Sequence, residues 1–461
     1  MKKALFLLVI LVGRFVLAET TLVDSERTAL ATHPTLRLAQ EETRVAQLKK
    51  HEAFRAVWPL VSLKGEITEG AAERTLQTPD FVEESYGVQL TQTLLQGGRL
   101  VRAYKQAKAN WLSVQAKEEK ARQEVLFGAR ESYWNFVKAI EVERIFQSAL
   151  TDLDKDRQMA SVLAEKDVIS RHVALTIYGQ SEQAVLNFEA AQAETVSRLW
   201  QWTAALGLNE PPTERPLPFL SSAPVDVPRL DDCLREAQSV HPDLTIQRFA
   251  SEAARYGHLA GKSLYFPRLS INGFYGRSGG AYENENFELK EDWQVGAQVS
   301  QYFGGSSLNA SAQEIKTSPK LGQSTRTQSR TYAGSLGIED SLKQKTEKAE
   351  ATFAHHQAAE ELRRTKMEVA NGVRNAYAEF MKSRSQARIA QMDLGLARTD
   401  YSVSQIKSTS REIPVSERSL TRNRVAQAEA AWLEARAQLH IAGAALARAI
   451  GRPNLLVKES Q

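Results

Sequence analysis

The stretch YGVQLTQTLLQGGR, residues 86–99, joins an alternating segment to a pair of glycines and a helix-rich region. Apolar and polar side chains alternate from Tyr86 to Thr91, and a period of two predicts a β-strand with one apolar and one polar face. After Gly97 and Gly98, helix-favouring Ala, Leu, Glu, Gln, Arg and Lys dominate as far as Leu206. The sequence therefore predicts a strand followed by long helices.

The second half of the chain repeats this order. HPTLRLAQEE at residue 33 recurs as HPDLTIQRFA at residue 241, and WPLVSL at residue 58 recurs as FPRLSI at residue 266, both at an offset of 208. The glycine pair recurs at 207, whereas the closing ALG of residues 205–207 recurs as AIG at an offset of 244. The jump of about 37 residues predicts an insertion in the second half.

The repeat predicts the domain organisation. A first structural repeat covers residues 19–208, a Pro-rich linker or equatorial segment covers 209–240, a second repeat covers 241–451, and a short tail covers 452–461. Each repeat is expected to hold a helix, two strands and two long helices. The strands are expected at about 58–70 and 83–96, then at about 267–280 and 289–303, followed by the insertion at about 306–341.

The strands have the length and pattern of membrane strands. Each is close to the ten or so residues that cross a bilayer, and aromatic residues such as Trp58, Phe266 and Tyr302 lie at their ends. A half-buried sheet of a soluble protein has the same alternation, so both interpretations stand at this point.

The helices are unusually long. A segment of about 60 helical residues spans about 90 Å, so it needs a coiled-coil partner to bury its apolar stripe. The segments from Arg99 to Leu206 and from Leu342 to Ile450 are interrupted near 166–170 and 408–414. Pro414 disfavours a helix at the second break. These breaks are the expected tips, where each helix pair turns.

The N-terminus and the composition restrict the class of protein. Residues 1–18, MKKALFLLVILVGRFVLA, are typical of a secretory signal peptide. The whole chain has 59 Lys and Arg against 55 Asp and Glu, too balanced for binding nucleic acid. The one cysteine, Cys233, forms no internal disulfide and is expected to be buried. No run of eighteen apolar residues is present, which excludes a bundle of transmembrane helices.

The sequence lacks the short catalytic and metal-binding motifs that would indicate an enzyme. The sequence has no P-loop, no His-Glu-x-x-His and no Gly-x-Ser-x-Gly. His355 and His356 are adjacent on a predicted helix, so they point about 100° apart and make a poor chelate. We therefore predict no enzyme activity, catalytic residue, cofactor or metal.

Four membrane strands require an oligomer. The smallest membrane barrels have eight strands, and open sheet edges in lipid leave backbone groups without hydrogen bonds. Several copies would therefore each contribute four strands. Polar residues on the inner face would make the lumen wet, which favours a conduit.

The ordered, duplicated motifs resemble the TolC-like outer-membrane efflux proteins. The motifs that carry the resemblance are His33-Pro34 and His241-Pro242, the first strands after Trp58 and Phe266, the strands before the two glycine pairs, and the closing Gly207 and Gly451. The resemblance implies an α+β membrane protein whose four strands join a homotrimeric, twelve-stranded barrel in outer-membrane lipid. Long coiled-coil hairpins would continue it as a periplasmic tunnel.

The resemblance also implies the function and the partners. The expected function is a passive exit duct for tripartite efflux or type I secretion. Its expected partners are a periplasmic adaptor and an inner-membrane pump of the RND, ABC or MFS type. The rival hypothesis is a soluble periplasmic coiled-coil adaptor or scaffold.

The helical tips are the candidate sites. The family often has Gly, Asp and Asp before its last long helix, at positions that correspond here to Arg411, Glu417 and Leu420. Glu417 keeps the acid and is the candidate pore constriction, whereas Arg411 and Leu420 depart from the pattern and argue against a double acidic ring. The residues expected to contact the adaptor are Lys166, Asp167, Val168, Ile169, Ser170, Ser410, Arg411, Glu412, Ile413 and Pro414.

Overall fold

The computed structural model describes residues 20–71, 80–212, 229–282, 288–317, 326–409 and 415–452. The chain forms two compact units, and neither coincides with a sequence repeat. The first unit comprises Met1–Gln40, Glu118–Pro242 and Lys366–Gln461, and the second comprises Glu41–Lys117 and Asp243–Thr365. The expected signal peptide, 1–18, and the tail beyond residue 452 lie outside the described residues.

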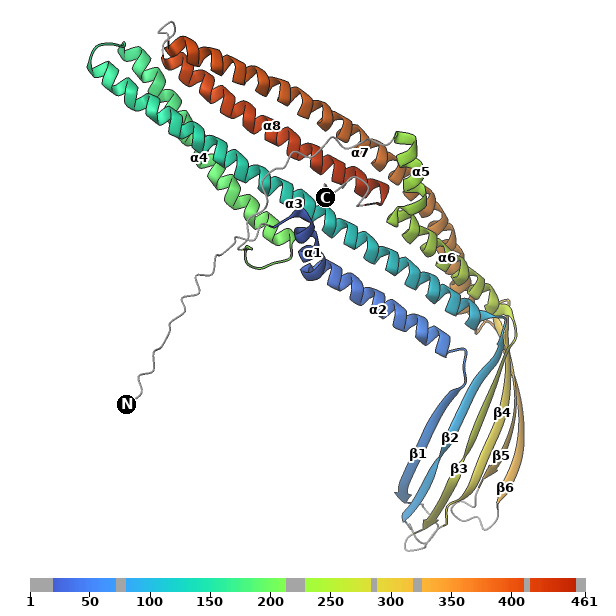
Figure 1. The fold of residues 1–461 in the computed structure, drawn as a ribbon. Helices are drawn as coiled ribbons and strands as arrows, with labels where there is room; N and C mark the ends of the chain where they lie inside the picture. Colours follow the sequence, from blue (N-terminus) through green and yellow to red (C-terminus); the bar gives the residue numbers. More distant parts are fainter. Residues whose placement is uncertain are drawn as a thin grey trace, which may run out of the picture. The chain divides into compact units, whose positions relative to one another are not determined.

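A six-stranded antiparallel sheet dominates the second unit. Its strands are neighbours in chain order, β1 to β6, so every connection between them is a hairpin or passes through helices (Figure 1). The strands are β1 (Leu60–Ala71), β2 (Asp80–Gln96), β3 (Arg268–Tyr282), β4 (Lys290–Phe303), β5 (Ser306–Thr317) and β6 (Thr327–Gly337). The four strands predicted from sequence are thus confirmed to within a few residues.

The insertion at 306–341 corrects the predicted strand number. The sequence predicted four strands per chain, whereas the insertion forms the hairpin of β5 and β6 and brings the sheet to six. Its alternation is weak in sequence because small residues such as Ala310, Ala312 and Gly334 occupy the apolar positions. The contrast between its two faces is therefore lower than in β1 to β4.

The two ends of the inserted hairpin lie close together. Gly304 and Gly305 turn directly from β4 into β5 with left-handed φ angles of 61° and 100°, which glycine adopts without steric cost. At the other end, the Ser341 amide donates to the Gly305 carbonyl over 2.9 Å, and the Ser307 hydroxyl donates to Asp340. Helix α7 (Leu342–Thr409) therefore begins beside the glycine pair, despite the 36 residues between Gly305 and Leu342.

Two helices of the second unit are fastened to each other by side-chain hydrogen bonds. This unit holds the end of α2 (Pro34–Arg55), the start of α3 (Arg99–Glu165), α6 (Pro242–Lys262) and the start of α7. Arg102 of α3 donates to the Leu259 carbonyl at 2.9 Å, and Ser113 of α3 donates to the Ile246 carbonyl at 3.1 Å, so two side chains fasten α3 to α6.

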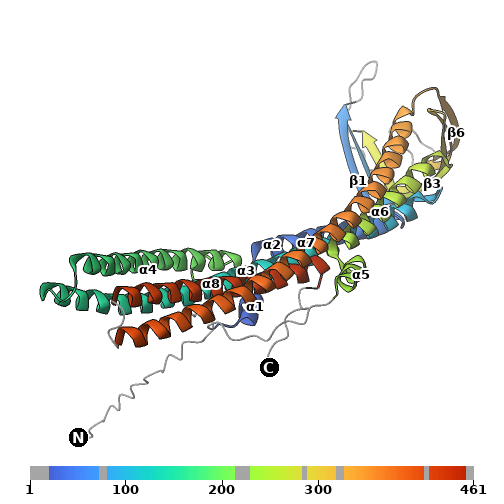
Figure 2. The same ribbon diagram turned by 90° about the horizontal axis from the view of Figure 1, so that it is seen from above.

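The first unit is a helical assembly. It contains α1 (Leu22–Thr32), α4 (Arg171–Ala205), α5 (Leu230–Val240) and α8 (Val415–Ile450), with the remainder of α3 and α7. Segments of α3, α4, α7 and α8 run side by side (Figures 1 and 2). The rings of Phe136 and Trp202 stack with their centroids 5.3 Å apart in a cluster of buried core residues. That cluster consists of Ala29, Val125, Ala129, Tyr133, Phe136, Val137, Trp202 and Leu206.

The duplicated terminal motifs meet within each repeat. Gly207 has a φ of 72°, and a Cβ added to it would lie 2.8 Å from the Cα of His33. Gly451 has a φ of 86°, and its Cβ would lie 2.9 Å from the Cα of His241. Each closing glycine thus ends a long helix and lets the opening His-Pro of the same repeat approach, which explains why the two motifs recur together.

The linker prediction needs a correction. Residues 209–240 were predicted to be a Pro-rich linker or equatorial segment, but α5 occupies 230–240, at the offset of 208 from α1. Cys233 on α5 is buried, and burial raises the pKa of its thiol. The proline-rich composition ends at Pro228, so a helix can form before His241. Each repeat therefore opens with two helices instead of the one that was predicted.

Candidate functional site

The sheet has two faces of opposite character. Residues paired directly across an antiparallel sheet lie on the same face, and one such row runs Leu63, Val88, Tyr275 and Trp293. The face that contains this row is called the apolar face below. Its apolar residues on β1 to β4 are Val61, Leu63, Ile67, Tyr86, Val88, Leu90, Leu269, Ile271, Tyr275, Trp293, Val295, Ala297 and Val299.

Large side chains on the apolar face are exposed. Leu63 is 84% exposed, Ile67 68% and Val295 54%. Contiguous exposed apolar patches are rare on monomeric soluble proteins, and they mark surfaces that meet a membrane or another protein. Among the described residues, no element covers these three side chains, which is typical of an interaction surface.

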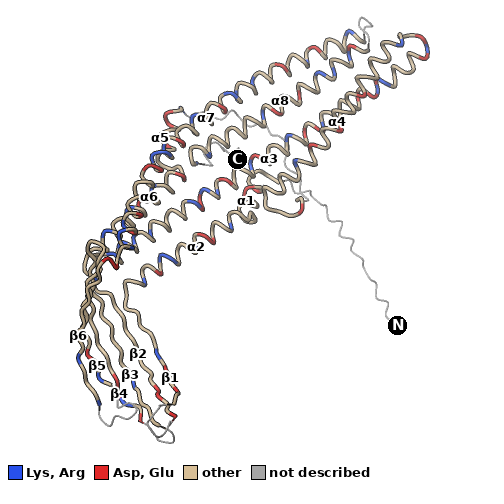
Figure 3. Tube along the Cα trace, turned by 180° about the vertical axis from the view of Figure 1, so that it is seen from behind, with Lys and Arg blue, Asp and Glu red and all other residues tan. Residues whose placement is uncertain are grey.

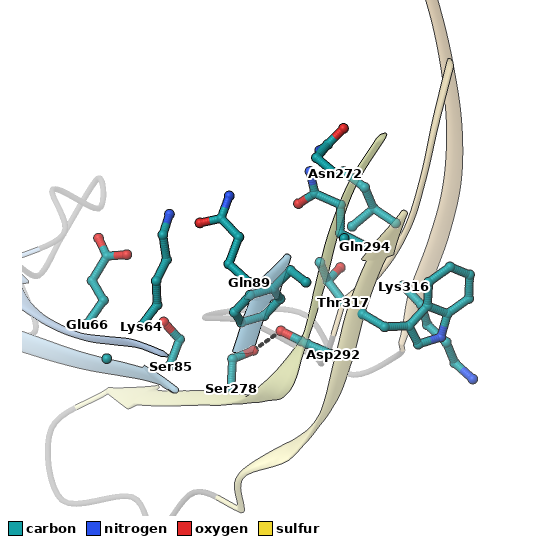
Figure 4. A pocket seen from close by; sticks show the side chains of 15 residues that line it. Lys64, Glu66, Ser85, Gln89, Asn272, Ser278, Asp292, Gln294, Lys316 and Thr317 are labelled. Atoms are coloured by element: carbon teal, nitrogen blue, oxygen red, sulfur yellow. Dashed lines mark hydrogen bonds between the residues drawn. The ribbon is translucent and has the colours of Figure 1, made fainter. Parts of the chain in front are cut away.

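The opposite face is polar and hollowed. A concavity of about 580 Å³ lies on it, and Lys64, Glu66 and Gln89 point to the same side of the sheet (Figure 4). Most of the lining comes from β1 to β4, and the rest from β5. The lining residues are Lys64, Gly65, Glu66, Ser85, Gln89, Asn272, Gly273, Phe274, Ser278, Asp292, Trp293, Gln294, Ile315, Lys316 and Thr317.

Hydrogen bonding and charge on the sheet fit a wet polar face. The Ser278 hydroxyl donates to the buried carboxylate of Asp292 on the neighbouring strand. Charged residues of the strands gather mostly toward the hairpin ends, whereas both signs are spread along the helices (Figure 3). The polar face therefore offers mixed hydrogen-bonding groups over a broad concavity, without a cluster of one charge.

The first helical tip, residues 166–170, is a compact turn. The Asp167 and Val168 amides donate to the Ala164 and Leu163 carbonyls at 3.1 and 2.9 Å, and Asp167 has a left-handed φ of 57°, so the turn closes α3 in a Schellman arrangement. The Ser170 hydroxyl accepts from the Val173 amide at 3.3 Å and caps α4. Val168 is 64% exposed, so this tip presents an apolar side chain at its surface.

The second tip is described only in part. Ser410, Arg411, Glu412, Ile413 and Pro414 lie outside the described residues. Glu417 lies in the first turn of α8 and is exposed, where the positive end of the helix dipole favours an acid. Glu417 and the residues of both tips keep the roles given above as predictions.

A buried ion pair near the tips escaped the sequence prediction. The carboxylate of Asp156 on α3 is buried, and it accepts from the Arg418 guanidinium and, at 2.7 Å, from the Ser419 hydroxyl of α8. One turn away on each helix, Arg422 donates to Asp152 at 3.0 Å. The signal was present in sequence, because the two acids and the two arginines are each spaced by four residues, which places each pair on one face of its helix.

Histidines of the described helices contact other aromatic rings. The His440 ring stacks on Trp134 with centroids 4.3 Å apart, and burial, assisted by the charge of Arg436, lowers the pKa of His440 to about 4. His258 and His355 stack at 5.5 Å. Within the described residues, no group of three or more His, Cys, Asp or Glu side chains could hold a metal ion.

None of the described helices contains a segment that is sufficiently long and apolar to cross a bilayer.

The comparison with protein families finds one match. Residues 233–452 match the family described as outer membrane efflux protein. These residues contain most of the second repeat and include α5, both strands before the inserted hairpin, the hairpin itself, and α7 and α8. A comparison with curated protein sequences finds no relative.

Solved structures match nearly the whole chain. The CmeC outer membrane channel of Campylobacter jejuni has a TM-score of 0.76 at 14% identity, with 94% of this chain and 86% of that chain covered. The open state of the MtrE outer membrane channel of Neisseria gonorrhoeae has a TM-score of 0.72 at 14% identity, with 95% and 90% covered. The outer membrane protein VceC of Vibrio cholerae has a TM-score of 0.71 at 12% identity, with 94% and 96% covered. The fold predicted from sequence, a duplicated α+β chain with long helical hairpins, is confirmed.

Proposed function

We propose that this chain, a TolC-like protein of the outer membrane efflux protein family, is a trimeric outer-membrane exit duct. The family match in sequence covers residues 233–452, and the match in fold covers almost the whole chain. In this proposal the duct passively conducts substrates out of the cell from a periplasmic adaptor and an inner-membrane pump. The assembly serves tripartite efflux or type I secretion. The proposal assigns no catalytic step to the chain.

The two-faced sheet is the observation that carries the proposal. Its apolar face exposes Leu63, Ile67 and Val295, whereas its other face is polar and concave. A membrane barrel needs this division, because lipid contacts its outer face and water fills its lumen. A sheet of this kind cannot stand alone in lipid, since β1 and β6 each have a strand neighbour on one side only within the described chain. Closure by further copies of the chain meets that requirement.

The proposal assigns the helices to the periplasmic side. Helix α3 alone has 67 residues and is about 100 Å long, which suits a tunnel rather than a globular domain. The tip residues 166–170 and 410–414 are proposed to contact the adaptor, and Glu417 is proposed to line the pore constriction. The exposed Val168 supports the first of these assignments, because an apolar side chain at a tip provides a surface for docking.

The rival hypothesis of a soluble periplasmic adaptor or scaffold is not favoured. The three solved structures compared above, which match the chain along 94% or 95% of its length, are described as outer membrane channels or proteins. A soluble scaffold also gives no reason for exposed Leu63 and Ile67 on one side of a sheet.

The test compares neighbouring positions on the two faces of β4. Val295→Asp places a charge on the apolar face and is expected to disfavour membrane assembly by about 2 kcal/mol, whereas Gln294→Asp on the polar face is expected to assemble normally. The measurement is the fraction of each variant recovered as folded oligomer from outer membranes. Equal recovery of both variants would contradict the barrel.

A second test addresses transport itself. A strain that lacks the protein is expected to become sensitive to dyes, detergents or metals, and to recover with the wild-type chain but not with Val295→Asp. Recovery with Val295→Asp in its non-membrane form would favour a scaffold.

A further inference from the structure

The hairpin of β5 and β6 continues both faces of the sheet. Leu308, Ala310 and Ala312 of β5 lie opposite Gln301, Val299 and Ala297 of β4, and therefore on the apolar face. On β6 the paired residues are Leu336, Gly334 and Tyr332. The alternate positions of the hairpin, including Asn309, Ser311, Thr331 and Ser335, are polar and lie on the polar face.

Charged residues on the hairpin lie in the half nearer its loop. Glu314 and Arg330 are opposite each other there, on the apolar face in the row of Val295, and the Arg330 Nε lies 3.1 Å from the Glu314 Oε1, so the two charges pair with each other. Over the three rungs closer to the glycine turn, neither strand has a charge on the apolar face. In that half the hairpin therefore has the same division into an apolar and a polar face as the wall formed by β1 to β4.

The outer edge of β6 is suited to a partner strand. All but one of its eleven residues are exposed, and it has neither proline nor more than one charged residue. Natural proteins that leave an edge open protect it with such features. In lipid, its unpaired backbone groups would require hydrogen bonds from another strand.

The opposite edge of the sheet fits β6. Strand β1 has 12 residues and β6 has 11, and in a sheet of six alternating strands they run in opposite directions. When β1 of one copy lies beside β6 of another, the pair is therefore antiparallel. Its apolar residues face one side and its polar residues the other. Lys64 and Glu66 of β1 would then face the lumen beside the serines and threonines of β6.

We propose that the inserted hairpin is part of the barrel wall and that β6 of each copy pairs with β1 of the next. This inference rests on the trimer of the proposed function. Three copies with six strands each form a barrel of eighteen strands in place of the twelve implied by the family resemblance. Because barrel diameter grows roughly linearly with strand number, the lumen of this barrel is about half as wide again.

Disulfide cross-linking distinguishes the two barrels. In a Cys233→Ala background, one cysteine is placed on β1 at Leu63 or Ile67. The second is placed in turn at Tyr332, Gly334 or Leu336 of β6. The competing set places it at Val295, Ala297 or Val299 of β4. Adjacent strands lie within disulfide reach, whereas β4 would be separated from the next β1 by two strands, too far for a bond.

The expected result is a covalent ladder up to trimer for at least one pair between β1 and β6, and none between β1 and β4. Each single-cysteine variant is the matched control. Cross-links between β1 and β4 would overturn the inference and leave a twelve-stranded duct. A trimer that forms neither set of cross-links would also overturn the inference. A protein that is never trimeric in the membrane would contradict the proposed function itself.

A second measurement tests the environment of the hairpin without cysteines. Ala312→Asp on the apolar face of β5 is expected to reduce recovery of membrane-assembled trimer several-fold, as Val295→Asp does. Ser311→Asp on the polar face is expected to leave it unchanged. Equal recovery of the two hairpin variants, with Val295→Asp still impaired, would overturn the placement of the hairpin in the wall and leave the duct intact.

Discussion

Two glycine pairs end corresponding strands, and the chain continues differently after each. Gly97 and Gly98 follow β2 and lead directly into α3, whereas Gly304 and Gly305 follow β4 and turn the chain back into β5. All four residues have left-handed φ angles. The glycines therefore permit a reversal of direction but do not determine the next element, which depends on the residues that follow.

Helix-favouring residues follow the first pair, and an alternating segment follows the second. After Gly98 the sequence RLVRAYKQAK continues as helix, whereas after Gly305 the sequence SSLNASAQ alternates and pairs with β4. Since α7 then begins beside Gly305, the insertion adds two strands without moving the start of the helix. The comparison shows how a duplicated fold can widen its sheet and keep its helices in register.

Substituting the first glycine of each pair is expected to give the largest difference in stability between the two turns. A Cβ at Gly97 would lie 2.6 Å from the Cβ of Phe266, whereas a Cβ at Gly304 would meet nothing within 4 Å. Gly97→Ala is expected to destabilise the fold by about 2–5 kcal/mol through overpacking and the left-handed φ. Gly304→Ala carries only the backbone term, about 1–2 kcal/mol.

The measurement is the midpoint of thermal unfolding of the purified protein in detergent. A larger loss for Gly304→Ala would contradict the described packing of the two turns.

The second prediction concerns how the two repeats are joined near the tips. Asp156→Ala removes the partner of Arg418 and leaves that guanidinium largely buried. We expect the free energy of unfolding to fall by about 3 kcal/mol. This value is at the lower end of the range for a broken buried ion pair, because Arg418 retains some contact with water. Asp154→Ala is the control, since its carboxylate accepts from the nearby Gln158 in an exposed position. Chemical unfolding followed by helical circular dichroism measures both. Similar unfolding midpoints would remove Asp156 from the joint.

The sequence predicted the long helices better than it predicted the additional hairpin and the contacts between distant residues. Composition was sufficient for the start of both long helices, at Arg99 and Leu342, because helix-favouring residues dominate from these positions on. The hairpin of β5 and β6 was missed because Ala and Gly at its apolar positions give little contrast. The pair of Asp156 and Arg418 was missed because the two residues lie 262 positions apart and are brought together only by packing.

The candidate tips show a different limit. The turn at 166–170 could be located from the break in helix-favouring residues, and its geometry confirms a turn there. Its partner is another protein, and a single sequence holds no physical record of that contact. The roles of Glu417 and of both tips accordingly stay predictions.

A third prediction uses a histidine present in only one repeat. His440 of α8 corresponds at the offset of 244 to Val196 of α4. In the unfolded chain His440 takes up a proton near its ordinary pKa of 6.5, but in the folded protein only near about 4. The unfolded state therefore gains stability as the pH falls through this window, and the fold is expected to lose about 1 kcal/mol between about pH 7.5 and 5.5.

His440→Val copies the first repeat and is expected to remove this contribution. Thermal unfolding at both pH values provides the measurement. An identical pH dependence in the variant and the wild type would show that His440 does not carry it.

The smallest expected effect lies at the second tip. Glu417 corresponds to Val173 in the first repeat, so only the second hairpin has an acid there. Glu417→Ala is expected to lower the cation preference of the reconstituted channel on the order of twofold, because charges exposed to solvent are partly screened by salt. Glu434→Ala, farther along α8, is the control. An unchanged reversal potential in a salt gradient would remove Glu417 from the constriction.

The central claim is that this chain forms a trimeric duct, and the mass and shape of the protein extracted from outer membranes with detergent test it most directly. We predict a trimer longer than about 100 Å, the length of α3 alone. A monomer or dimer recovered from the soluble periplasmic fraction would contradict the duct and restore the scaffold hypothesis.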